Sequence, residues 1–433
     1  MNQTGTNANL RKAWRGWCLY DWANSAFATV ILAAVLTVYF ASLVPADGAE
    51  LTFFGMKHRM PATALWGYVI SLSMLAVALL APYIGARADA HRARRRSLIL
   101  CCLIGATATA MLSVTGPGQY LLAAGLFIIG NIGFATGNIF YNSFLPALAE
   151  ASDLDRLSAR GFAAGYLGGG LALLAVFILI QQYQLFGLAD RATATRIGFL
   201  LTGLWWAGFA IPAFRHIREE VFIHDPEPLL YGLKGYFKTF SRIRHYPHLL
   251  RFLVAFLFYN DGIQTVIAVS AIFASVELGM SQASILGCFL MIQFIAMPGA
   301  LIFAALAARI GAKKTVMLSL LLFVGVTVYA FIIDSAAEFW FLGFVVALIL
   351  GGSQAISRSL FATMVPKSRS AEFFGFYAVS GKFASIFGPL VFAIISDVTG
   401  SARLSILALS GFFIIGTFIL AKVDIEQGRQ QAA

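Results

Sequence analysis

The sequence predicts an all-α polytopic membrane protein, and its composition and hydrophobic pattern are the reasons. Of its 433 residues, 59% are hydrophobic and 12% are charged. Soluble globular domains carry about 25% charged residues, so that class is excluded. Hydrophobic runs of about 20 residues, long enough to cross the core of a bilayer, recur along nearly the whole chain. The alternating pattern of transmembrane β-strands is absent, so the spans are expected to be helices.

About twelve membrane-spanning helices are expected from these runs. Their predicted ranges are residues 17–43, 65–86, 98–115, 120–144, 161–183, 196–215, 249–275, 283–308, 315–333, 338–360, 372–397 and 403–422. The first run follows basic residues, as a signal peptide would, but it is too long and ends without a clear cleavage site, so we expect a retained helix. Because twelve is even, both chain ends are expected on the same side of the membrane.

Basic residues set the predicted orientation, because loops rich in Lys and Arg stay in the cytoplasm. One group lies after the second helix, after the eighth helix and in the 216–248 loop, and comprises Arg87, Arg92, Arg94, Arg95, Arg96, Arg309, Lys313, Lys314, Arg218, Lys234, Lys238, Arg242 and Arg244. The opposite loops carry only Lys57, Arg59, Arg191, Arg196 and Arg403. We therefore expect both termini on the cytoplasmic side of the cell (inner) membrane. The net charge of +11 then requires no nucleic-acid partner.

The polar loop at 216–248 divides the chain into two predicted bundles, residues 1–215 and 249–433, with six helices each. An Ile-Gly-Ala motif before a basic turn begins at Ile84 and again at Ile310. Many secondary transporters are built from such repeated halves, with the substrate site near the middle of the membrane. The repetition therefore favours a transporter with two pseudo-symmetric bundles.

Polar side chains concentrate in every third predicted helix: the first, fourth, seventh and tenth. They recur at helical spacing, so on each helix most of them share one face. They are Asp21, Asn24 and Ser25; Asn131, Asn138 and Asn142; Asn260, Asp261, Gln264 and Thr265; and Gln354, Ser357 and Arg358. Most other helices are almost purely apolar, with Gln293 and Lys382 as the main exceptions. Because charged groups are unfavourable against lipid, we expect these faces to line one common cavity.

Two interpretations stay open for the uncharged members of this group. Amides such as Asn24 and Asn142 contact the substrate, or they form hydrogen bonds between helices that contribute about 0.6 kcal/mol each. The glycines at positions 161, 165 and 169 leave a similar choice between a sliding contact and static close packing of helices.

The charged residues are more often functional, because charge inside a membrane is rarely kept without a role. Asp21 and Asp261 are the candidate proton or cation sites, since burial favours the protonated form of a carboxylate. A nearby Arg358 or Lys382 would favour the ionised form instead. These two cations are also candidates for binding an anionic substrate group, although Arg358 could equally extend to the lipid headgroups.

Several motifs resemble a known family. Gly85-Ala-Arg-Ala-Asp89, with the basic cluster after it, resembles the loop motif between helices 2 and 3 of the major facilitator superfamily. It departs from that motif at residues 90–93, where a basic residue and a glycine are usual. Four further stretches resemble the branch related to the yeast vacuolar effluxer Atg22, also called the UMF1 family: Tyr20–Ala26, Gly165–Gly170, Gly352–Ser359 and Glu372–Tyr377. The resemblance spans both halves and most of the chain.

This resemblance implies a major facilitator fold, with about twelve transmembrane helices in two pseudo-symmetric six-helix bundles. It also implies a gating motif at Gly85, Asp89 and Arg92, in which Asp89 pairs with arginines and helix ends to hold one conformation. Eukaryotic members are associated with amino-acid efflux from the vacuole. The compact chain with short loops looks like a bacterial member.

The combined prediction is a secondary transporter of a small organic solute, with an amino-acid-like solute as the first candidate, working by alternating access. Coupling to protons would use Asp21 and Asp261, and uniport remains open. The predicted substrate-binding residues are Asn24, Asn138, Asn142, Asn260, Gln264, Gln354, Arg358 and Lys382. A monomer is expected. The alternatives are a membrane enzyme, or a sensor or scaffold on a transporter-like fold.

No cofactor or metal is expected. The four cysteines fall in or beside hydrophobic runs without metal-ligand spacing, and there is no His-Glu-x-x-His pair and no P-loop. Hydrolytic or ATP-driven chemistry would therefore lack its usual parts.

Overall fold

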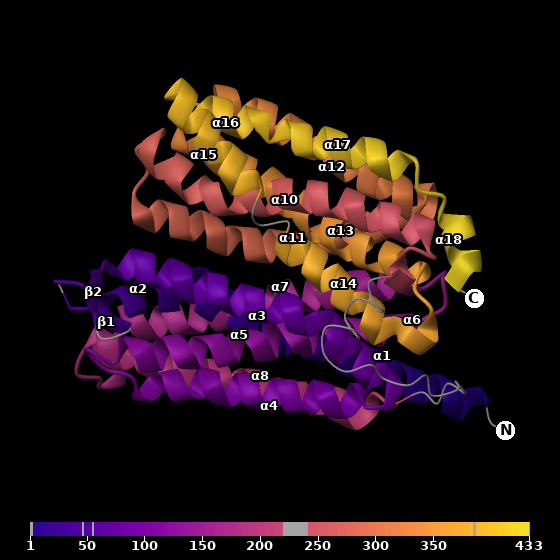
Figure 1. Ribbon diagram of the computed structural model, residues 1–433, viewed down its shortest axis with the longest axis horizontal. Helices are drawn as coiled ribbons and strands as arrows, with labels where there is room; N and C mark the ends of the chain where they lie inside the picture. Colours follow the sequence, from indigo (N-terminus) through magenta and orange to yellow (C-terminus); the bar gives the residue numbers. More distant parts are fainter. Residues whose placement is uncertain (1–2, 46, 54–55, 220–240, 384–386, 433) are drawn as a thin grey trace. The chain divides into compact units, whose positions relative to one another are not determined.

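The computed structural model describes residues 3–45, 47–53, 56–219, 241–383 and 387–432, and nearly all of them are helical (Figure 1). Eleven stretches in this part are long and apolar enough to cross a membrane, which confirms the predicted class. They are Ala8–Leu43, Ala64–Ala90, Arg94–Val114, Tyr120–Leu148, Leu154–Gln181, Arg191–His216, Pro247–Val276, Ser284–Ile310, Ala312–Ile332, Ala336–Thr363 and Ala402–Ala421. The remaining predicted span, 372–397, falls on two shorter helices, with residues 384–386 outside the described part.

The chain divides into two compact units, and each is described by itself. The first comprises Met1–Leu80, Arg94–Tyr141 and Leu167–Glu219. The second comprises Ala81–Ala93, Asn142–Tyr166 and Glu220–Ala433. The predicted domain boundaries around the 216–248 linker stay a prediction, because residues 220–240 lie outside the described part.

The first unit is built from the N-terminal helices. Its elements are α1 (Gln3–Ala26), the π-helix η1 (Phe27–Ala34), α2 (Val35–Leu43), β1 (Ala49–Phe53), β2 (Met56–Met60), α3 (Ala62–Ala90), α4 (Arg94–Met111), the 3-10 helix η2 (Leu112–Val114), α5 (Tyr120–Ser143), α7 (Leu154–Gln181), the 3-10 helix η3 (Tyr183–Phe186) and α8 (Arg191–His216). The ends of α3 and α5 and the start of α7 belong to the second unit.

Aromatic side chains fill the centre of the first unit, where α1 and α4 pack along α8. Phe27, Phe134 and Trp206 come from three different elements, and their ring centroids lie 5.1, 5.4 and 6.2 Å apart. Trp206 lies directly over Gly105, where any Cβ atom would overlap the indole. Large rings against a bare backbone allow these helices to approach closely, as small residues commonly do in membranes.

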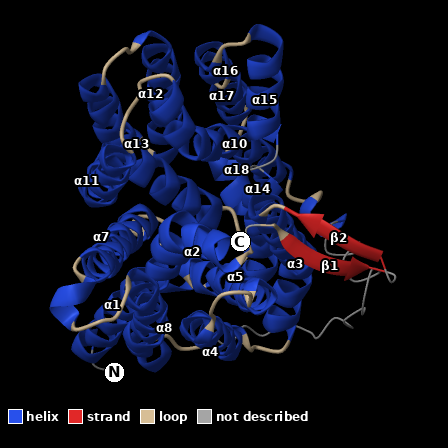
Figure 2. Ribbon diagram, turned by 90° about the vertical axis from the view of Figure 1, so that its left-hand side faces the viewer, coloured by secondary structure: helices blue, strands red, loops and turns tan. Residues whose placement is uncertain are grey.

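A β-hairpin that the sequence analysis did not predict lies between α2 and α3 (Figure 2). Its strands β1 and β2 pair antiparallel, with Ala49 opposite Met60. Tyr120 Oη, at the start of α5, donates to the Glu50 carbonyl and accepts from the Glu50 N–H, both at 3.1 Å.

The second unit contains the remaining helices. They are α6 (Leu145–Leu148), α10 (Pro247–Val276), α11 (Gln282–Ile310), α12 (Ala312–Ile332), α13 (Ala336–Thr363), the 3-10 helix η4 (Lys367–Arg369), α14 (Ser370–Phe383), α15 (Phe387–Thr399), α16 (Ala402–Ala408), α17 (Ser410–Ala421) and α18 (Ile425–Ala432). Helix α13 packs along α11 and α12, and α17 packs along α10 and α12 (Figure 1). Ala159, Ala163, Ala300 and Ala355 form a cluster of small buried residues that brings the start of α7 against α11 and α13.

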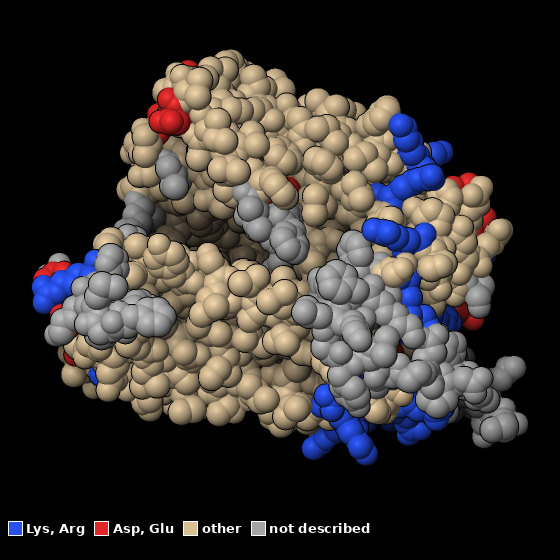
Figure 3. Space-filling view, in the orientation of Figure 1, with Lys and Arg blue, Asp and Glu red and all other residues tan. Residues whose placement is uncertain are grey.

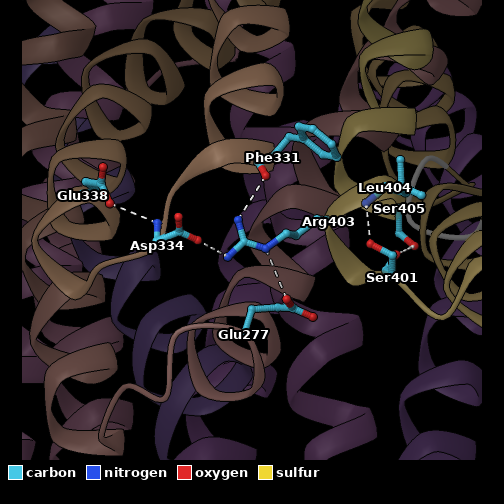
Figure 4. A network of polar contacts seen from close by, with 8 residues as sticks. All are labelled: Glu277, Phe331, Asp334, Glu338, Ser401, Arg403, Leu404 and Ser405. Carbon is cyan, nitrogen blue, oxygen red and sulfur yellow. Dashed lines mark hydrogen bonds and ion pairs between the residues drawn. The ribbon is translucent and has the colours of Figure 1, made fainter.

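Arg403 joins three elements at one end of the second unit (Figure 4). It lies at the start of α16, and its guanidinium contacts Asp334 at 2.8 Å, the Phe331 carbonyl at 3.1 Å and Glu277 at 3.4 Å. These partners follow α10 and end α12, so one side chain fixes the spacing of three helix ends.

Candidate functional site

In the first unit, Asp21 is held by an aromatic pair. Tyr141 Oη donates to the Asp21 carboxylate at 2.9 Å, and Asp21 is only 8% exposed. Trp17 stacks on the Tyr141 ring with centroids 4.4 Å apart and donates its indole N–H to the Tyr141 carbonyl at 2.9 Å. Helices α1 and α5, the predicted first and fourth spans, therefore meet at this carboxylate.

One turn further along α1, two amides that the sequence analysis selected contact each other. Asn24 Nδ2 donates to Asn138 Oδ1 at 2.9 Å, and Asn138 Nδ2 donates to the Phe134 carbonyl at 3.1 Å. Asn131 instead faces α3, where its Nδ2 donates to Ser73 at 2.7 Å. The two stripes do converge, but Asn131 acts as an interhelical contact away from Asn138.

In the second unit, Arg358 of α13 is the centre of a buried cluster, called here the Arg358 cluster: Asn142, Ser158, Phe162 and Arg358. Its Nε donates to Ser158 Oγ at 2.9 Å, Nη2 donates to the Ser158 carbonyl at 2.8 Å and Nη1 donates to Asn142 Oδ1 at 3.2 Å. The Phe162 ring lies 4.1 Å from the guanidinium carbon. Arg358 is 3% exposed, so the alternative in which it extends to lipid headgroups is wrong.

Three further polar residues of α13 also form hydrogen bonds. Gln354 Oε1 accepts from Tyr166 Oη at 2.6 Å, and Ser357 Oγ accepts from Tyr259 Oη at 2.8 Å. Ser359, which the sequence analysis did not select, donates to Asp155 at the start of α7. The polar face of α13 is thus bonded to α7 on one side and to α10 on the other.

Asp261 of α10 caps the first turn of α15. Its two carboxylate oxygens accept from the Gly388 N–H at 2.9 and 3.0 Å, and Asp261 is 1% exposed. Thr265, one turn along α10, donates to the Asp261 carbonyl at 2.7 Å. A carboxylate at the N-terminal end of a helix is favoured by the exposed amides and the helix dipole.

Asn260 and Gln264 differ from the other predicted binding residues. Neither side chain makes a hydrogen bond within the described part of the chain, although Asn260 is only 5% exposed and Gln264 is half-buried. Buried amides are usually hydrogen-bonded, so these two groups have capacity for a ligand. The side chain of Lys382, also predicted to bind substrate, lies outside the described part.

The predicted gating motif places Asp89 at the start of α14. Asp89 accepts from the Glu372 N–H at 2.8 Å and from the Ala371 N–H at 3.3 Å. Gly85 lies against the Ala371 backbone so closely that a Cβ atom would overlap it, and Gly375 lies against the backbone of the turn of α3 that precedes Gly85. Arg92 is exposed and has a left-handed φ of 52° in the turn after α3.

Several partners in these contacts were missed from the sequence. They all have hydroxyl side chains and lie on long apolar helices: Tyr141, Ser158, Tyr166, Tyr259 and Ser359. Ser158, Tyr259 and Ser359 lie within two residues of a charged side chain, whereas Tyr141 and Tyr166 do not, so no such signal was available for those two tyrosines. Among the described residues, no group of three or more His, Cys, Asp or Glu side chains could hold a metal ion.

Comparisons with known proteins agree with this geometry. The family model described as "Vacuole effluxer Atg22 like" matches residues 9–433. The MFS-type transporter YxiO of Bacillus subtilis is 34% identical over 413 residues, which cover 95% of this chain and 94% of that protein. Autophagy-related protein 22-1 of Aspergillus niger is 26% identical, over 84% of this chain and 73% of that protein.

Among solved structures, the human organic anion transporter MFSD10 has a TM-score of 0.71 at 18% identity, over 95% of this chain and 98% of that one. At that identity the likeness shows the fold alone, and it confirms the predicted major facilitator architecture. YxiO and MFSD10 are both described as transporters, which gives no support to the membrane-enzyme alternative. The similarity to a Bacillus protein fits the expected bacterial member. The chain therefore belongs to the vacuole effluxer Atg22-like family of the major facilitator superfamily.

Proposed function

We propose that this major facilitator transporter moves a small organic solute, with amino-acid-like solutes as the first candidates, by alternating access. The observation that carries the proposal is the Arg358 cluster. Its arginine comes from the predicted second half of the chain, and Ser158 and Asn142 come from the first. A buried set of hydrogen bonds between the halves is a contact that must break when an alternating-access transporter changes state.

The Asp89 contact supplies a second such contact within the same unit. Asp89 and Gly85 belong to the first half, and the α14 backbone that they touch belongs to the second. In this contact Gly85 and Gly375 let the backbones pack closely, and the Asp89 carboxylate lies at the N-terminus of α14. The contact is therefore tight, but it can separate without moving large side chains. We assign these two contacts to one gate.

We place this gate on the cytoplasmic side. The turn after Asp89 is strongly basic, and the second unit gathers Lys and Arg side chains at the end where α18 lies (Figure 3). Lys313 belongs to that end, where its Nζ donates to the Ala421 and Val423 carbonyls at 2.7 Å. Basic residues concentrate on the cytoplasmic side of membrane proteins, which also supports cytoplasmic termini.

Substrate recognition is assigned first to Asn260 and Gln264. They lie one turn apart on α10 and make no side-chain hydrogen bond to any residue that the structure describes, whereas Gln354 and Arg358 do. Amides both donate and accept, which suits a solute that carries an amino and a carboxylate group. The resemblance to amino-acid effluxers points to the same solute class.

Proton coupling is assigned to Asp21 and Asp261. The Asp21 carboxylate accepts a hydrogen bond from the Tyr141 hydroxyl, and the Asp261 carboxylate accepts from the Gly388 amide. A proton added to either carboxylate removes the charge that makes those bonds strong, so protonation would change how α1 contacts α5 and how α10 contacts α15. Uniport is the competing arrangement, in which neither residue changes its protonation.

The experiment is a two-step assay on the purified full chain. A thermal-shift screen of amino acids and short peptides identifies a solute, since a bound ligand stabilises the folded state by mass action. That solute is then measured in liposomes with wild type and Asp21→Asn. We expect Asp21→Asn to fold normally and to lose flux driven by a proton gradient. Wild-type flux in that variant would remove Asp21 from the mechanism, and a panel without any flux would remove the proposed solute class.

A further inference from the structure

Two carboxylates meet at the first turn of α14, and the second of them is buried. Asp89 accepts from the backbone N–H groups of Ala371 and Glu372, while the Glu372 side chain belongs to the same turn. Glu372 is only 2% exposed. A carboxylate removed from water is strongly unfavourable unless a cation or several donors compensate its charge. The contact between Asp89 and α14 therefore depends on what neutralises Glu372.

Arg242 supplies positive charge at this point. Its Nη1 lies 3.4 Å from Glu372 Oε1, and its side chain is 21% exposed, so the pair lies at the edge of the buried region. Four residues further on, Tyr246 packs edge-on against Phe373 with ring centroids 5.1 Å apart. The stretch before α10 thus contacts the first turn of α14 at two successive residues.

This stretch is the end of the 216–248 linker that joins the two predicted halves. We propose that Arg242 makes this end of the linker part of the gate. It is a positioning residue: its positive charge compensates the negative charge of Glu372 and so keeps the start of α14 in contact with Asp89. The inference rests on the proposed gate, and it adds an element that the gating motif does not contain. Opening the gate then requires either that the Arg242–Glu372 pair separates or that it moves with α14.

The effects of replacing Arg242 and Glu372 should depend on each other. Without Arg242, an ionised Glu372 beside Asp89 disfavours the closed contact, because two carboxylates then share one helix end with less compensation. If Glu372 is made neutral, Arg242 is no longer needed there. The effect of removing Arg242 should therefore disappear when Glu372 is replaced by Gln, which a merely structural role for the Arg242 side chain would not predict.

The test measures how often the gate opens. Cys18, Cys101, Cys102 and Cys288 are replaced by Ala, and Ala371→Cys serves as the reporter because Ala371 is fully buried. The rate at which a maleimide labels this cysteine in reconstituted full-length protein reports opening. We expect Arg242→Ala to raise the rate by about tenfold, Arg242→Lys to raise it much less, and Glu372→Gln to cancel the effect of Arg242→Ala.

Two further variants make the outcomes distinct. Arg251→Ala removes an exposed arginine of α10 and should leave the labelling rate unchanged. Asp89→Asn tests the gate itself and should raise the rate. If Asp89→Asn raises labelling and Arg242→Ala does not, the role of the linker is overturned and the gate stands. If neither variant changes labelling while both melt like wild type, the gate and the role of Arg242 fall together.

Discussion

The carboxylate of Asp261 accepts hydrogen bonds from the backbone N–H of Gly388 at 2.9 and 3.0 Å. This contact joins α10 to the first turn of α15, which lies in the predicted 372–397 span. An acid that caps a helix inside a membrane-spanning region is placed to connect its own protonation with the position of that helix. Asp261 is therefore the first residue at which to test proton coupling.

Replacing Asp261 by Asn should separate charge from hydrogen bonding. The amide oxygen can still accept from Gly388, but the attraction between a carboxylate and the helix N-terminus, worth about 0.3–1 kcal/mol at exposed sites and more when partly buried, is lost. We expect a small drop in melting temperature and flux that no longer responds to an imposed pH difference. Liposome flux measured at several pH values checks this, and an unchanged pH response would exclude Asp261 as the coupling site.

Gly388 itself should tolerate no side chain. A Cβ atom there would overlap Thr265 Oγ1 and lie 2.9 Å from Asp261 Oδ1. Gly388→Ala is expected to destabilise the protein by about 1–3 kcal/mol, the usual range for overpacking. Because removal of the Thr265 hydroxyl makes room, Thr265→Ala should restore part of this loss in the double variant.

The matched control for this prediction is Gly411→Ala on α17, where a Cβ atom meets nothing within 4 Å. The melting temperatures of Gly388→Ala, Thr265→Ala, the double variant and Gly411→Ala are compared in detergent. Equal melting temperatures for Gly388→Ala and Gly411→Ala would contradict the close approach of α15 to α10.

Arg358 should not be replaceable by Lys. Its three donor groups reach two oxygens of Ser158 and the Asn142 amide, and a lysine ammonium cannot reproduce that fork. Hydrogen bonds to charged groups contribute about 1.5–3 kcal/mol each, so losing them should shift the protein away from the closed gate. We expect Arg358→Lys and Arg358→Ala both to reduce flux by about tenfold or more.

The readout for Arg358 is flux in liposomes together with maleimide labelling of the buried reporter at position 371. Reduced flux with faster labelling is the expected combination. Full activity in Arg358→Lys would mean that the Arg358 cluster is packing alone and takes no part in gating.

The C-terminal helix α18 should depend on His248 for its docking. His248 Nδ1 accepts from the Asp424 backbone N–H at 3.0 Å, and Nε2 lies 2.9 Å from Gln427 Oε1. A backbone N–H can only donate, so Nδ1 is the acceptor in the first of these contacts. Removal of the ring leaves the Asp424 N–H and the Gln427 amide without these contacts, so His248→Ala should weaken the docking of α18.

A spin label at Gln430→Cys in the cysteine-free protein reports this docking, because Gln430 is an exposed residue of α18. Label mobility should rise when His248→Ala is added to that background. Arg251→Ala removes an exposed side chain of the same helix α10 and should leave the mobility unchanged. Equal label mobility with and without His248→Ala would contradict a role for His248 in docking α18.

The sequence predicted the class of fold and the helix faces because both depend on local periodicity. Hydrophobic runs locate the spans, and helical spacing alone placed Asn24, Gln354 and Arg358 on polar faces. The contact between Asn24 and Asn138 follows from two such faces meeting. The contact between Asp261 and Gly388 did not follow, because the two residues are 127 positions apart and only tertiary packing brings them together.

The hydrogen-bond partners of these residues could not be predicted from helical spacing. Arg358 was selected from the sequence because it carries a charge within a predicted membrane span. Nothing in the sequence distinguishes its partner Ser158 from the other serines, and only the packing of α7 on α13 brings the two residues together. The same holds for Tyr166, which occupies Gln354. Helical spacing therefore predicts which side chains share a face of one helix, whereas tertiary packing decides which side chains of other helices they contact.

Solute counterflow is the decisive measurement for alternating-access transport by this protein. Liposomes containing the purified protein are loaded with the unlabelled amino acid that gives the largest thermal shift, and entry of the labelled form is followed without ATP or an ion gradient. We expect a transient accumulation of label with wild type and none with Arg358→Ala. Absence of counterflow in wild type for every solute that stabilises the protein would rule out alternating-access transport of these solutes.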